Sequence, residues 1–392
     1  MSGVHASDPP AIVLQASGPN SLGIIRSLAR AGVRVIACDH DPKALGLLSR
    51  YATPSLMADP LTEPERFLAD LTALARAEGG GVLFPTHDEA VATIGPHEAE
   101  IDAVVRRPWS PWATMSAIID KGHQHEVARR IGFPVPATVT PADDADIVAL
   151  ARDLRFPVIL KPRYSPEFRR RFRAQVLEAA NPEELRRQWD LAAEYRPQLS
   201  EVIPGDDSHL WSLGSYRDAE GRPLGSFTGR KLRQWPPRFG TARAAEGHWD
   251  ADYAARGHAL LDALDLHGIS QLETKRDLRD GRDYLIEVNP RSWLWIGLAT
   301  NCGVNLPYLA WRDAIGRPEV QPGGHRSGVR WILATKHLAG SVREIRRGQW
   351  TARAFASTLR PPVVDGVLDP RDPRPALALY GRALRGLGRR RG

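Results

Sequence analysis

Two carboxylates set among apolar residues constrain the fold of this 392-residue chain more than any other feature. Glu273 lies in the segment Gln-Leu-Glu-Thr-Lys and Glu287 in Leu-Ile-Glu-Val-Asn, and each segment is typical of a strand. Asn289 follows Glu287 by two places, so both side chains lie on one face of the second strand. The acidic turn residues 277–283 between the segments predict a hairpin that brings Glu273 alongside Glu287.

This hairpin predicts a metal site. Two carboxylates forced together inside a core repel each other unless a cation lies between them. Hard oxygen ligands suit Mg²⁺, which usually keeps several waters and bridges to nucleotide phosphates. Two exposed hairpin glutamates are the plainer alternative, but the apolar neighbours favour metal ligation by Glu273, Glu287 and Asn289.

Two lysines upstream are placed to meet phosphates. Lys161 ends the apolar run 158–160, just before Pro162, and Lys121 follows Asp120 in a helix-forming stretch. A lysine at a strand end beside a turn can meet a phosphate as a point charge. Either lysine alone would be an ordinary solvated side chain, and it is the carboxylate hairpin downstream that makes the set specific.

The segment from Glu201 to Asp207 follows a further strand. Its Pro-Gly turn would leave the backbone before it free to present an N–H and a C=O to an adenine edge. Asp206 and Asp207 could accept hydrogen bonds from ribose hydroxyls. Taken alone, the segment is a strand that leads into an acidic turn.

The first third of the chain predicts a parallel α/β sheet. Apolar runs at 11–15, 33–38 and 82–85 alternate with helical spacing from Leu22 to Gly32. Thr86 and Glu89 have the spacing of a capping box for the helix that follows. The first turn lacks the glycine fingerprint of dinucleotide-binding folds, which argues against an NAD(P)H-dependent oxidoreductase.

Composition excludes several other classes of protein. There is no apolar run near the ~18 residues of a membrane span, and the first residues do not form a signal peptide. The two cysteines, Cys38 and Cys302, exclude a disulfide framework or a four-cysteine zinc site, so a cytoplasmic location is expected. The net charge of +7 gathers in the C-terminal tail and in the run 169–173, a distribution that predicts neither a nucleic-acid nor a membrane partner.

The order of these motifs resembles the ATP-grasp superfamily. The matching segments are Asp120-Lys121, the run 156–162, the run 200–205, Glu273, and the run 287–291. Within the superfamily, residues 289–293 and 302–307 look like the carboxylate–amine ligases, including the D-aspartate ligase type. The resemblance covers roughly residues 11–315 and implies a parallel α/β pre-ATP-grasp domain followed by a two-subdomain ATP-grasp fold of mixed α/β and α+β class.

This resemblance divides the chain into four units. The expected bounds are 1–112 for the pre-ATP-grasp domain, 113–196 for the small subdomain, 197–319 for the large subdomain with the metal site, and 320–392 for an extension of uncertain fold. Three local features accompany them: an amphipathic stretch at 115–131, a helix at about 142–154, and a helix capped by Asn181.

The resemblance also implies a role for each candidate residue. Mg²⁺, with Mn²⁺ as the alternative ion, and ATP are the implied cofactors. The implied contacts are Lys121 and Lys161 with the ATP phosphates, Glu201 and the backbone of Ile203 with adenine, Asp207 (or Asp206) with ribose, Glu273, Glu287 and Asn289 with the metal ions, and Arg291 with the acyl phosphate.

Three segments leave alternatives open. Where many ATP-grasp enzymes have a glycine-rich phosphate lid, residues 164–168 hold no glycine, and the arginine run 169–173 is either a substitute lid or a basic exposed hairpin. Residues 229–241 suit a substrate loop in which Lys231 contacts a phosphate or carboxylate, or else a basic surface loop. Residues 87–89 could suggest acid–base chemistry but better suit a helix start, although a strand-end loop can also line a substrate cleft.

Together these features favour an ATP-dependent ligase that forms an amide or peptide bond through an acyl phosphate and releases ADP and phosphate. Its partners would be a small-molecule carboxylate and an amine, one of them an amino acid, and ligases of this superfamily are often homodimers. The alternatives are an ATP-grasp carboxylase or carboligase, and a nucleotide-binding regulatory protein with a degenerate site. The intact set of lysines and carboxylates argues against the degenerate site.

Overall fold

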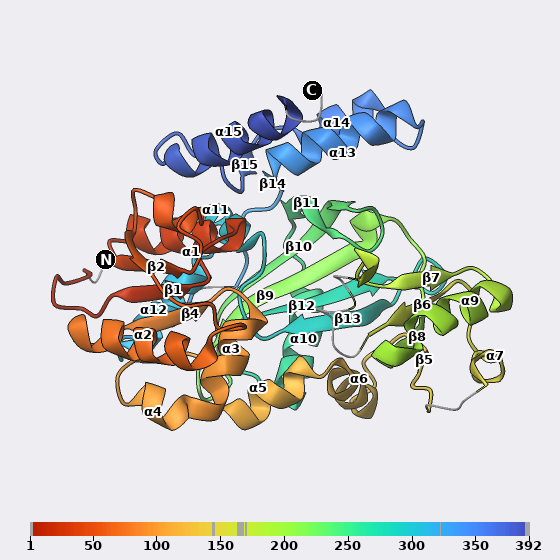
Figure 1. The fold of residues 1–392 in the computed structure, drawn as a ribbon, viewed down its shortest axis with the longest axis horizontal. Coiled ribbons are helices and arrows are strands. Elements are labelled where there is room, and N and C mark those ends of the chain that lie inside the picture. The colour runs from red at the N-terminus through yellow and green to blue at the C-terminus, as the bar shows by residue number, and fades with distance from the viewer. Residues whose placement is uncertain (1–2, 143–145, 163–167, 169–170, 322, 389–392) are drawn as a thin grey trace.

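Three β-sheets organise the protein, whose computed structural model describes residues 3–142, 146–162, 168, 171–321 and 323–388. A parallel sheet and a small antiparallel sheet lie at opposite ends of a central seven-stranded sheet (Figure 1). Helices formed by the last residues lie across one side of the molecule, along the top of this view.

The N-terminal sheet is entirely parallel, with strand order β3-β2-β1-β4. Its strands are β1 (Ala11–Leu14), β2 (Val35–Asp39), β3 (Thr53–Leu56) and β4 (Val82–Pro85). The helices of this unit are α1 (Pro19–Arg30), η1 (Gly46–Leu48), α2 (Pro64–Ala77), α3 (Asp88–Ile94), η2 (Gly95–His97) and α4 (Glu98–Asp102). Strands β1, β2 and β4 are buried along their whole length, as expected for parallel strands covered on both faces. The predicted parallel α/β sheet is confirmed.

The loops after β1 and β4 lie side by side because these strands are neighbours in the sheet. The Thr86 hydroxyl donates to Gln15 O at 2.7 Å, and Asn20 Nδ2 donates to Thr86 O at 2.9 Å. The capping box predicted from Thr86 and Glu89 is therefore wrong. His87 is the N-cap residue of α3, and the Thr86 hydroxyl binds the neighbouring loop instead.

Two short helices connect this unit to the small sheet. The amphipathic stretch predicted at 115–131 is divided into α5 (Trp112–Ile119) and α6 (Lys121–Arg130). Asp120 separates them, because its extended backbone ends α5 and its side chain caps α6 by accepting from Gly122 N at 2.8 Å. Lys121 thus becomes the first residue of α6.

The small sheet is antiparallel, with strand order β5-β8-β6-β7. Its elements are β5 (Thr138–Val139), α7 (Ile147–Leu150), β6 (Val158–Lys161), β7 (Leu177–Ala179), α9 (Pro182–Ala192), η3 (Ala193–Tyr195) and β8 (Gln198–Glu201). Asn181 caps α9 by accepting from Glu184 N at 2.9 Å, as predicted. Of the helix predicted at 142–154 only α7 forms, and residues 143–145 lie outside the described part of the chain.

The central sheet has the strand order β13-β12-β9-β10-β11-β14-β15 and is antiparallel except at β14–β15. Its strands are β9 (Leu210–Arg217), β10 (Pro223–Trp235), β11 (Thr241–Gly247), β12 (Gly268–Arg276), β13 (Asp283–Asn289), β14 (Arg330–Ile332) and β15 (Val363–Asp365). The other elements of this part are η4 (Asp207–His209), α10 (Ala251–Ala263), α11 (Ile296–Cys302), α12 (Leu306–Ala314), α13 (Ala334–Arg346), α14 (Ala352–Thr358) and α15 (Arg374–Gly388).

The C-terminal extension, whose fold the sequence left uncertain, is part of the core assembly. Strands β14 and β15 widen the central sheet. Asp372 is fully buried and accepts hydrogen bonds from Arg26 Nε at 3.0 Å, Ser49 Oγ at 2.8 Å and Arg50 N at 2.9 Å, all in the N-terminal unit. The extension therefore ties the central sheet to the first sheet.

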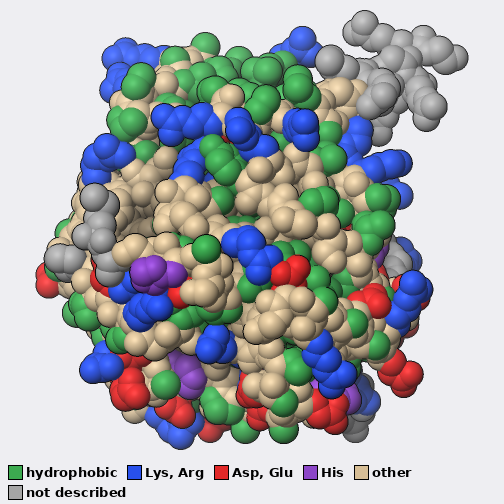
Figure 2. All heavy atoms as spheres, turned by 90° about the vertical axis from the view of Figure 1, so that its left-hand side faces the viewer, with side chains coloured by type: hydrophobic (Ala, Val, Ile, Leu, Met, Phe, Trp, Pro, Cys, Tyr) green, Lys and Arg blue, Asp and Glu red, His purple; other side chains and the backbone are tan. Residues whose placement is uncertain are grey.

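Figure 2 shows the surface on the side of the N-terminal unit. Basic side chains are interspersed there with acidic and apolar ones, and apolar side chains gather at the top, over the C-terminal extension. In the described part of the chain, no helix combines the length and the apolar character needed to cross a bilayer.

Candidate active site

The two predicted carboxylates meet in the central sheet. Glu273 on β12 and Glu287 on β13 are directly opposite each other in an antiparallel pair, and Gln271 is opposite Asn289. Side chains directly opposite in such a pair lie on the same face. The predicted hairpin and the shared face are therefore confirmed.

Each carboxylate has its own lysine. Lys231 Nζ lies 2.7 and 2.8 Å from the two carboxylate oxygens of Glu273, and both side chains are more than nine-tenths buried. Lys121 Nζ lies 2.8 Å from Glu287 Oε2, and this pair is about one-third exposed. The lysines come from β10 and from the start of α6, so two distant segments of the chain converge on the hairpin.

The cluster shifts the pKa of its members in different directions. Burial raises the pKa of Glu273, although its lysine partner opposes this shift. The Lys121 ammonium holds the pKa of Glu287 well below its usual range, so Glu287 is charged at neutral pH. Burial, together with the charge of Lys121, lowers the pKa of Lys161 to about 7. The Lys161 ammonium lies 3.5 Å from the backbone oxygen of Ile286, beside the same strand.

The oxygen donors suit a magnesium ion. No three acidic, histidine or cysteine side chains gather into a metal-binding group among the described residues. The candidate set is instead two carboxylates and the Asn289 amide, a small set that fits an ion which takes its remaining ligands from phosphates and water. Asn289 Nδ2 donates to Glu287 Oε1 at 3.2 Å, so the amide would have to turn over to present its oxygen.

Arg291 joins the hairpin to the N-terminal unit. Its Nε and Nη2 atoms donate to the two carboxylate oxygens of Asp88, at 2.6 and 3.0 Å. Its Nη1 donates to Ser292 O at 2.8 Å, and Nη2 lies 3.5 Å from Asn289 Oδ1. The residue expected to contact the acyl phosphate thus lies beside the carboxylate cluster and is paired with an aspartate at the start of α3.

The segment predicted to hold adenine lies between the small and central sheets. Ile203 is 3% exposed, and its backbone N–H and C=O have no hydrogen-bond partner within the described residues. Glu201 ends β8, and its side chain accepts from Arg155 N at 2.8 Å. The backbone of Ile203 is therefore available to a ligand.

Asp207 is fastened to the strand that carries Lys231. Its two oxygens accept from the backbone N and the side-chain Nε2 of Gln234, both at 2.9 Å. Gln234 Oε1 in turn lies 3.5 Å from Lys231 Nζ. Asp206 is more exposed and accepts from Ser208 N at 2.9 Å, which closes the turn. Because each carboxylate oxygen has two lone pairs, Asp207 could accept from a ribose hydroxyl while keeping both bonds to Gln234.

The segment predicted as a substrate loop at 229–241 is largely a strand. Its first half lies in β10, because residues 229–235 pair with β11, and only the tight turn that follows is a loop. Arg233 stacks over the Trp350 ring at 4.3 Å from the C-terminal extension, and Arg238 Nη1 donates to Glu178 on β7 at 2.8 Å. The segment therefore spans from the extension to the small sheet.

The expected lid falls mostly outside the described residues, which omit 163–167 and 169–170. Arg171 lies over the Phe172 ring at 5.3 Å, and Phe172 packs on Phe168 at 4.6 Å between ring centres.

Sequence reasoning missed three residues that contact the predicted set. Asp88 was interpreted as part of a helix start or cleft loop and not as a partner of Arg291, whereas Gln234 and Gln271 were not singled out. Gln271 had a detectable signal, because it lies two places before Glu273 on the same strand face. The other two contacts depend on the tertiary fold.

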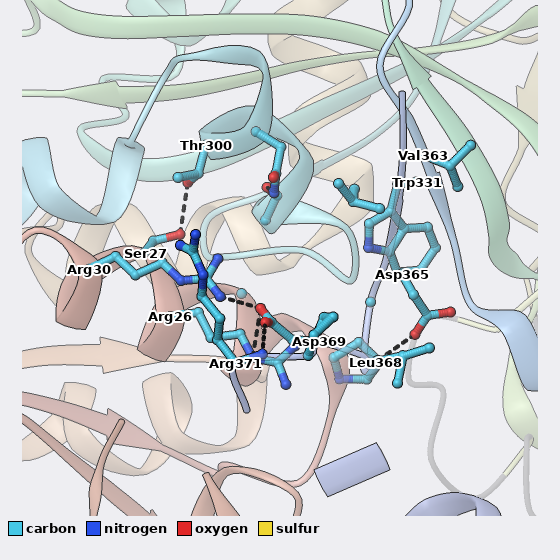
Figure 3. Close-up of a pocket in the computed structure, with 17 residues that line it drawn as sticks. Arg26, Ser27, Arg30, Thr300, Trp331, Val363, Asp365, Leu368, Asp369 and Arg371 are labelled. Atoms are coloured by element: carbon cyan, nitrogen blue, oxygen red, sulfur yellow. Dashed lines mark hydrogen bonds and ion pairs between the residues drawn. The ribbon is translucent and has the colours of Figure 1, made fainter. Parts of the chain in front are cut away.

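A separate cavity of about 350 Å³ shares no lining residue with this cluster (Figure 3). It lies between α1, α11 and the segment after β15. Two of its arginines are already paired with carboxylates: Arg30 with Asp369, and Arg26 with Asp372. Asp365 accepts from the backbone of Ala334 and Val367. The cavity is therefore a polar seam where the extension docks on the N-terminal unit.

Comparison with known proteins points to the same superfamily. No family model matches the chain. The D-aspartate ligase of Enterococcus faecium is 25% identical over 246 residues, which are 60% of this chain and 58% of that protein. The chain thus spans less than two-thirds of that relative.

Solved structures share the fold at low identity. The biotin carboxylase domain of the Hydrogenobacter thermophilus 2-oxoglutarate carboxylase, solved with MgADP and bicarbonate, has a TM-score of 0.63 at 16% identity over 82% of this chain and 73% of that one. The L-amino acid ligase of Bacillus licheniformis has a TM-score of 0.59 at 14% identity over 80% of this chain and 76% of that one. The chain has the ATP-grasp fold, and its likeness to the carboxylate–amine ligases of that superfamily, first indicated by its motifs, is confirmed.

Proposed function

We propose that the protein is an ATP-dependent carboxylate–amine ligase that forms an amide or peptide bond through an acyl phosphate. The observation that carries this proposal is the position of Glu273 and Glu287, opposite each other on adjacent strands and each paired with a lysine. Arg291 follows on the same strand end and supplies a cation for an oxyanion. Such an arrangement suits phosphoryl transfer, which depends on positioning and charge neutralisation.

ATP would lie between the small and central sheets. The free backbone N–H and C=O of Ile203 suit an adenine edge, and Lys121 and Lys161 suit the phosphates. Mg²⁺, when bound by Glu273, Glu287 and Asn289, would neutralise phosphate charge, and a related fold has been solved with MgADP. The lysines that now pair with the glutamates would then face phosphate oxygens.

The reaction has two steps. A carboxylate oxygen of the acid attacks the γ-phosphorus, the bond from that phosphorus to the β–γ bridging oxygen breaks, and ADP leaves. The amine nitrogen then attacks the acyl carbon, the bond from carbon to the phosphate oxygen breaks, and phosphate leaves while the nitrogen loses a proton. Arg291, next to Asn289, would stabilise the acyl phosphate and the tetrahedral species that follows it.

The sequence likeness to a D-aspartate ligase supports an amino acid as one substrate. A carboxylase with the same fold provides the rival function, because a related biotin carboxylase domain has been solved with bicarbonate. The two functions differ in the acid that ATP activates. The substrates that are needed for phosphate release therefore distinguish them.

The test is a matrix of amino acids and small acids with phosphate release as the readout. The proposal predicts release only when a carboxylate and an amine are both present, whereas release with bicarbonate alone would indicate the carboxylase. Glu287→Gln should abolish ADP formation. Glu78→Gln is the matched control, because Glu78 is 27% exposed like Glu287 and also pairs with one cation, yet lies in the N-terminal unit. Wild-type turnover in Glu287→Gln would refute the metal assignment.

A further inference from the structure

The anion-binding edge of Arg291 is already filled from within the protein. A guanidinium binds carboxylate or phosphate most strongly through two parallel N–H groups. In Arg291 the edge formed by Nε and Nη2 is taken by both oxygens of Asp88, at 2.6 and 3.0 Å. The Nη1 atom donates to the backbone of Ser292. An external oxyanion can use that edge only after Asp88 leaves it.

The two partners of this ion pair differ in burial. The Arg291 side chain is 19% exposed, whereas the Asp88 side chain is 48% exposed. Asp88 is thus the more exposed partner of the pair. Burial alone would lower the pKa of Arg291, but the charge of Asp88 reverses this effect and raises it. Asp88 therefore occupies the two N–H groups that a ligand would use, and competes with it for them.

The pair is not needed to hold the two units together. The buried Ser292 hydroxyl donates to Pro85 O at 3.2 Å across the same interface. Helices α1 and α11 also touch, since a Cβ added to Gly23 would lie 3.0 Å from Gly297 N. An ion pair whose aspartate is half exposed adds little to such an interface. The close geometry of Asp88 and Arg291 therefore calls for another role.

We propose that Asp88 is an internal counter-ion that occupies the oxyanion site of Arg291 and is displaced by a two-oxygen anion. Under the proposed function, on which this identification of the ligand rests, the anion is the substrate carboxylate or the phosphate of its acyl phosphate. Asp88 would then decide which acids enter, because only an anion that binds the guanidinium edge better than a carboxylate held at the start of α3 can replace it.

The test measures binding of inorganic phosphate by titration calorimetry at constant ionic strength. Asp88→Asn leaves the edge of Arg291 without its charged partner, so phosphate should bind about tenfold more tightly than to the wild type. Glu89→Gln is the matched control. It removes the same charge one residue away, with no hydrogen bond to Arg291 in the described structure, and should stay within about twofold of the wild type. Asp88→Asn binding no more tightly than Glu89→Gln would overturn the proposal.

A second variant shows whether the tighter phosphate binding occurs at Arg291. In Asp88→Asn combined with Arg291→Gln the gain should vanish, and a gain that persists without Arg291 would also overturn the proposal. Phosphate binding needs no turnover, so this result stands apart from the ligase assay. If ligase activity is found, Asp88→Asn should lower the KM for the acid, whereas a role limited to orienting Arg291 would lower kcat and leave that KM unchanged.

Discussion

Replacing Lys231 with methionine should make the stability of the protein depend strongly on pH. Lys231 and Glu273 are 9% and 7% exposed and lie 2.7 Å apart. Without the ammonium, Glu273 would be a buried charge with no partner of its own, which costs about 3–5 kcal/mol. The carboxylate can instead take up a proton, which limits the loss to about 1.4 kcal/mol for each pH unit above its ordinary pKa of 4.5.

The sign follows from the direction of the pKa shift. Burial already raises the folded-state pKa of Glu273, and losing Lys231 raises it further. A raised carboxyl pKa favours the folded state at low pH, and that advantage is lost as pH rises through the folded pKa. Lys231→Met should therefore lose less than about 1 kcal/mol at pH 5 and about 3 kcal/mol at pH 7.

The assay is urea unfolding followed by tryptophan fluorescence at both pH values. Arg66→Met is the control, because Arg66 and its partner Glu63 are 72% and 49% exposed and the variant should show no measurable loss. An equal loss of unfolding free energy for Lys231→Met at pH 5 and pH 7 would refute the reasoning. It would mean that the loss does not come from the charge of Glu273.

Two further predictions concern the nucleotide site and the extension. The pKa of Lys161, lowered to about 7, leaves this side chain largely neutral at pH 8. ATP binding should therefore take up protons at pH 8, because the phosphates restore the positive charge of Lys161. Heats measured in buffers of different ionisation enthalpy should reveal this uptake, and an equal uptake in Lys161→Met would contradict it. Asp372→Asn should destabilise the protein by about 3 kcal/mol, because Asp372 is fully buried and Arg26 would lose the nearer of its two carboxylate partners. Limited proteolysis should then release fragments from residues 320–392 earlier than in the wild type, and unchanged cleavage would argue against this anchor.

The sequence was informative where local pattern and tertiary environment agree. Strands β1, β2 and β4 of the parallel sheet are short apolar runs between turn signals, so they could be located from the sequence, whereas β3 has no such pattern and was not predicted. Glu273 and Glu287 were conspicuous because a carboxylate in an apolar strand needs a partner. Their pairing followed from the acidic turn between them.

The parts that escaped prediction depend on contacts between distant segments. Arg291 and Asp88 are 203 residues apart, and nothing local to either one indicates the other. The extension is held through Asp372, whose partners lie more than 320 residues earlier in the chain. Asp120 divides the stretch predicted as continuous at 115–131, because its extended backbone ends α5 while its side chain caps α6.

The most direct test of the acyl-phosphate route uses an acid labelled with ¹⁸O in both carboxylate oxygens, together with the amine identified in the substrate matrix. Because a carboxylate oxygen attacks the γ-phosphorus and later leaves with it, each released phosphate should carry one ¹⁸O atom, as measured by mass spectrometry. Phosphate released without the label, while amide product accumulates, would contradict activation of the carboxylate by ATP.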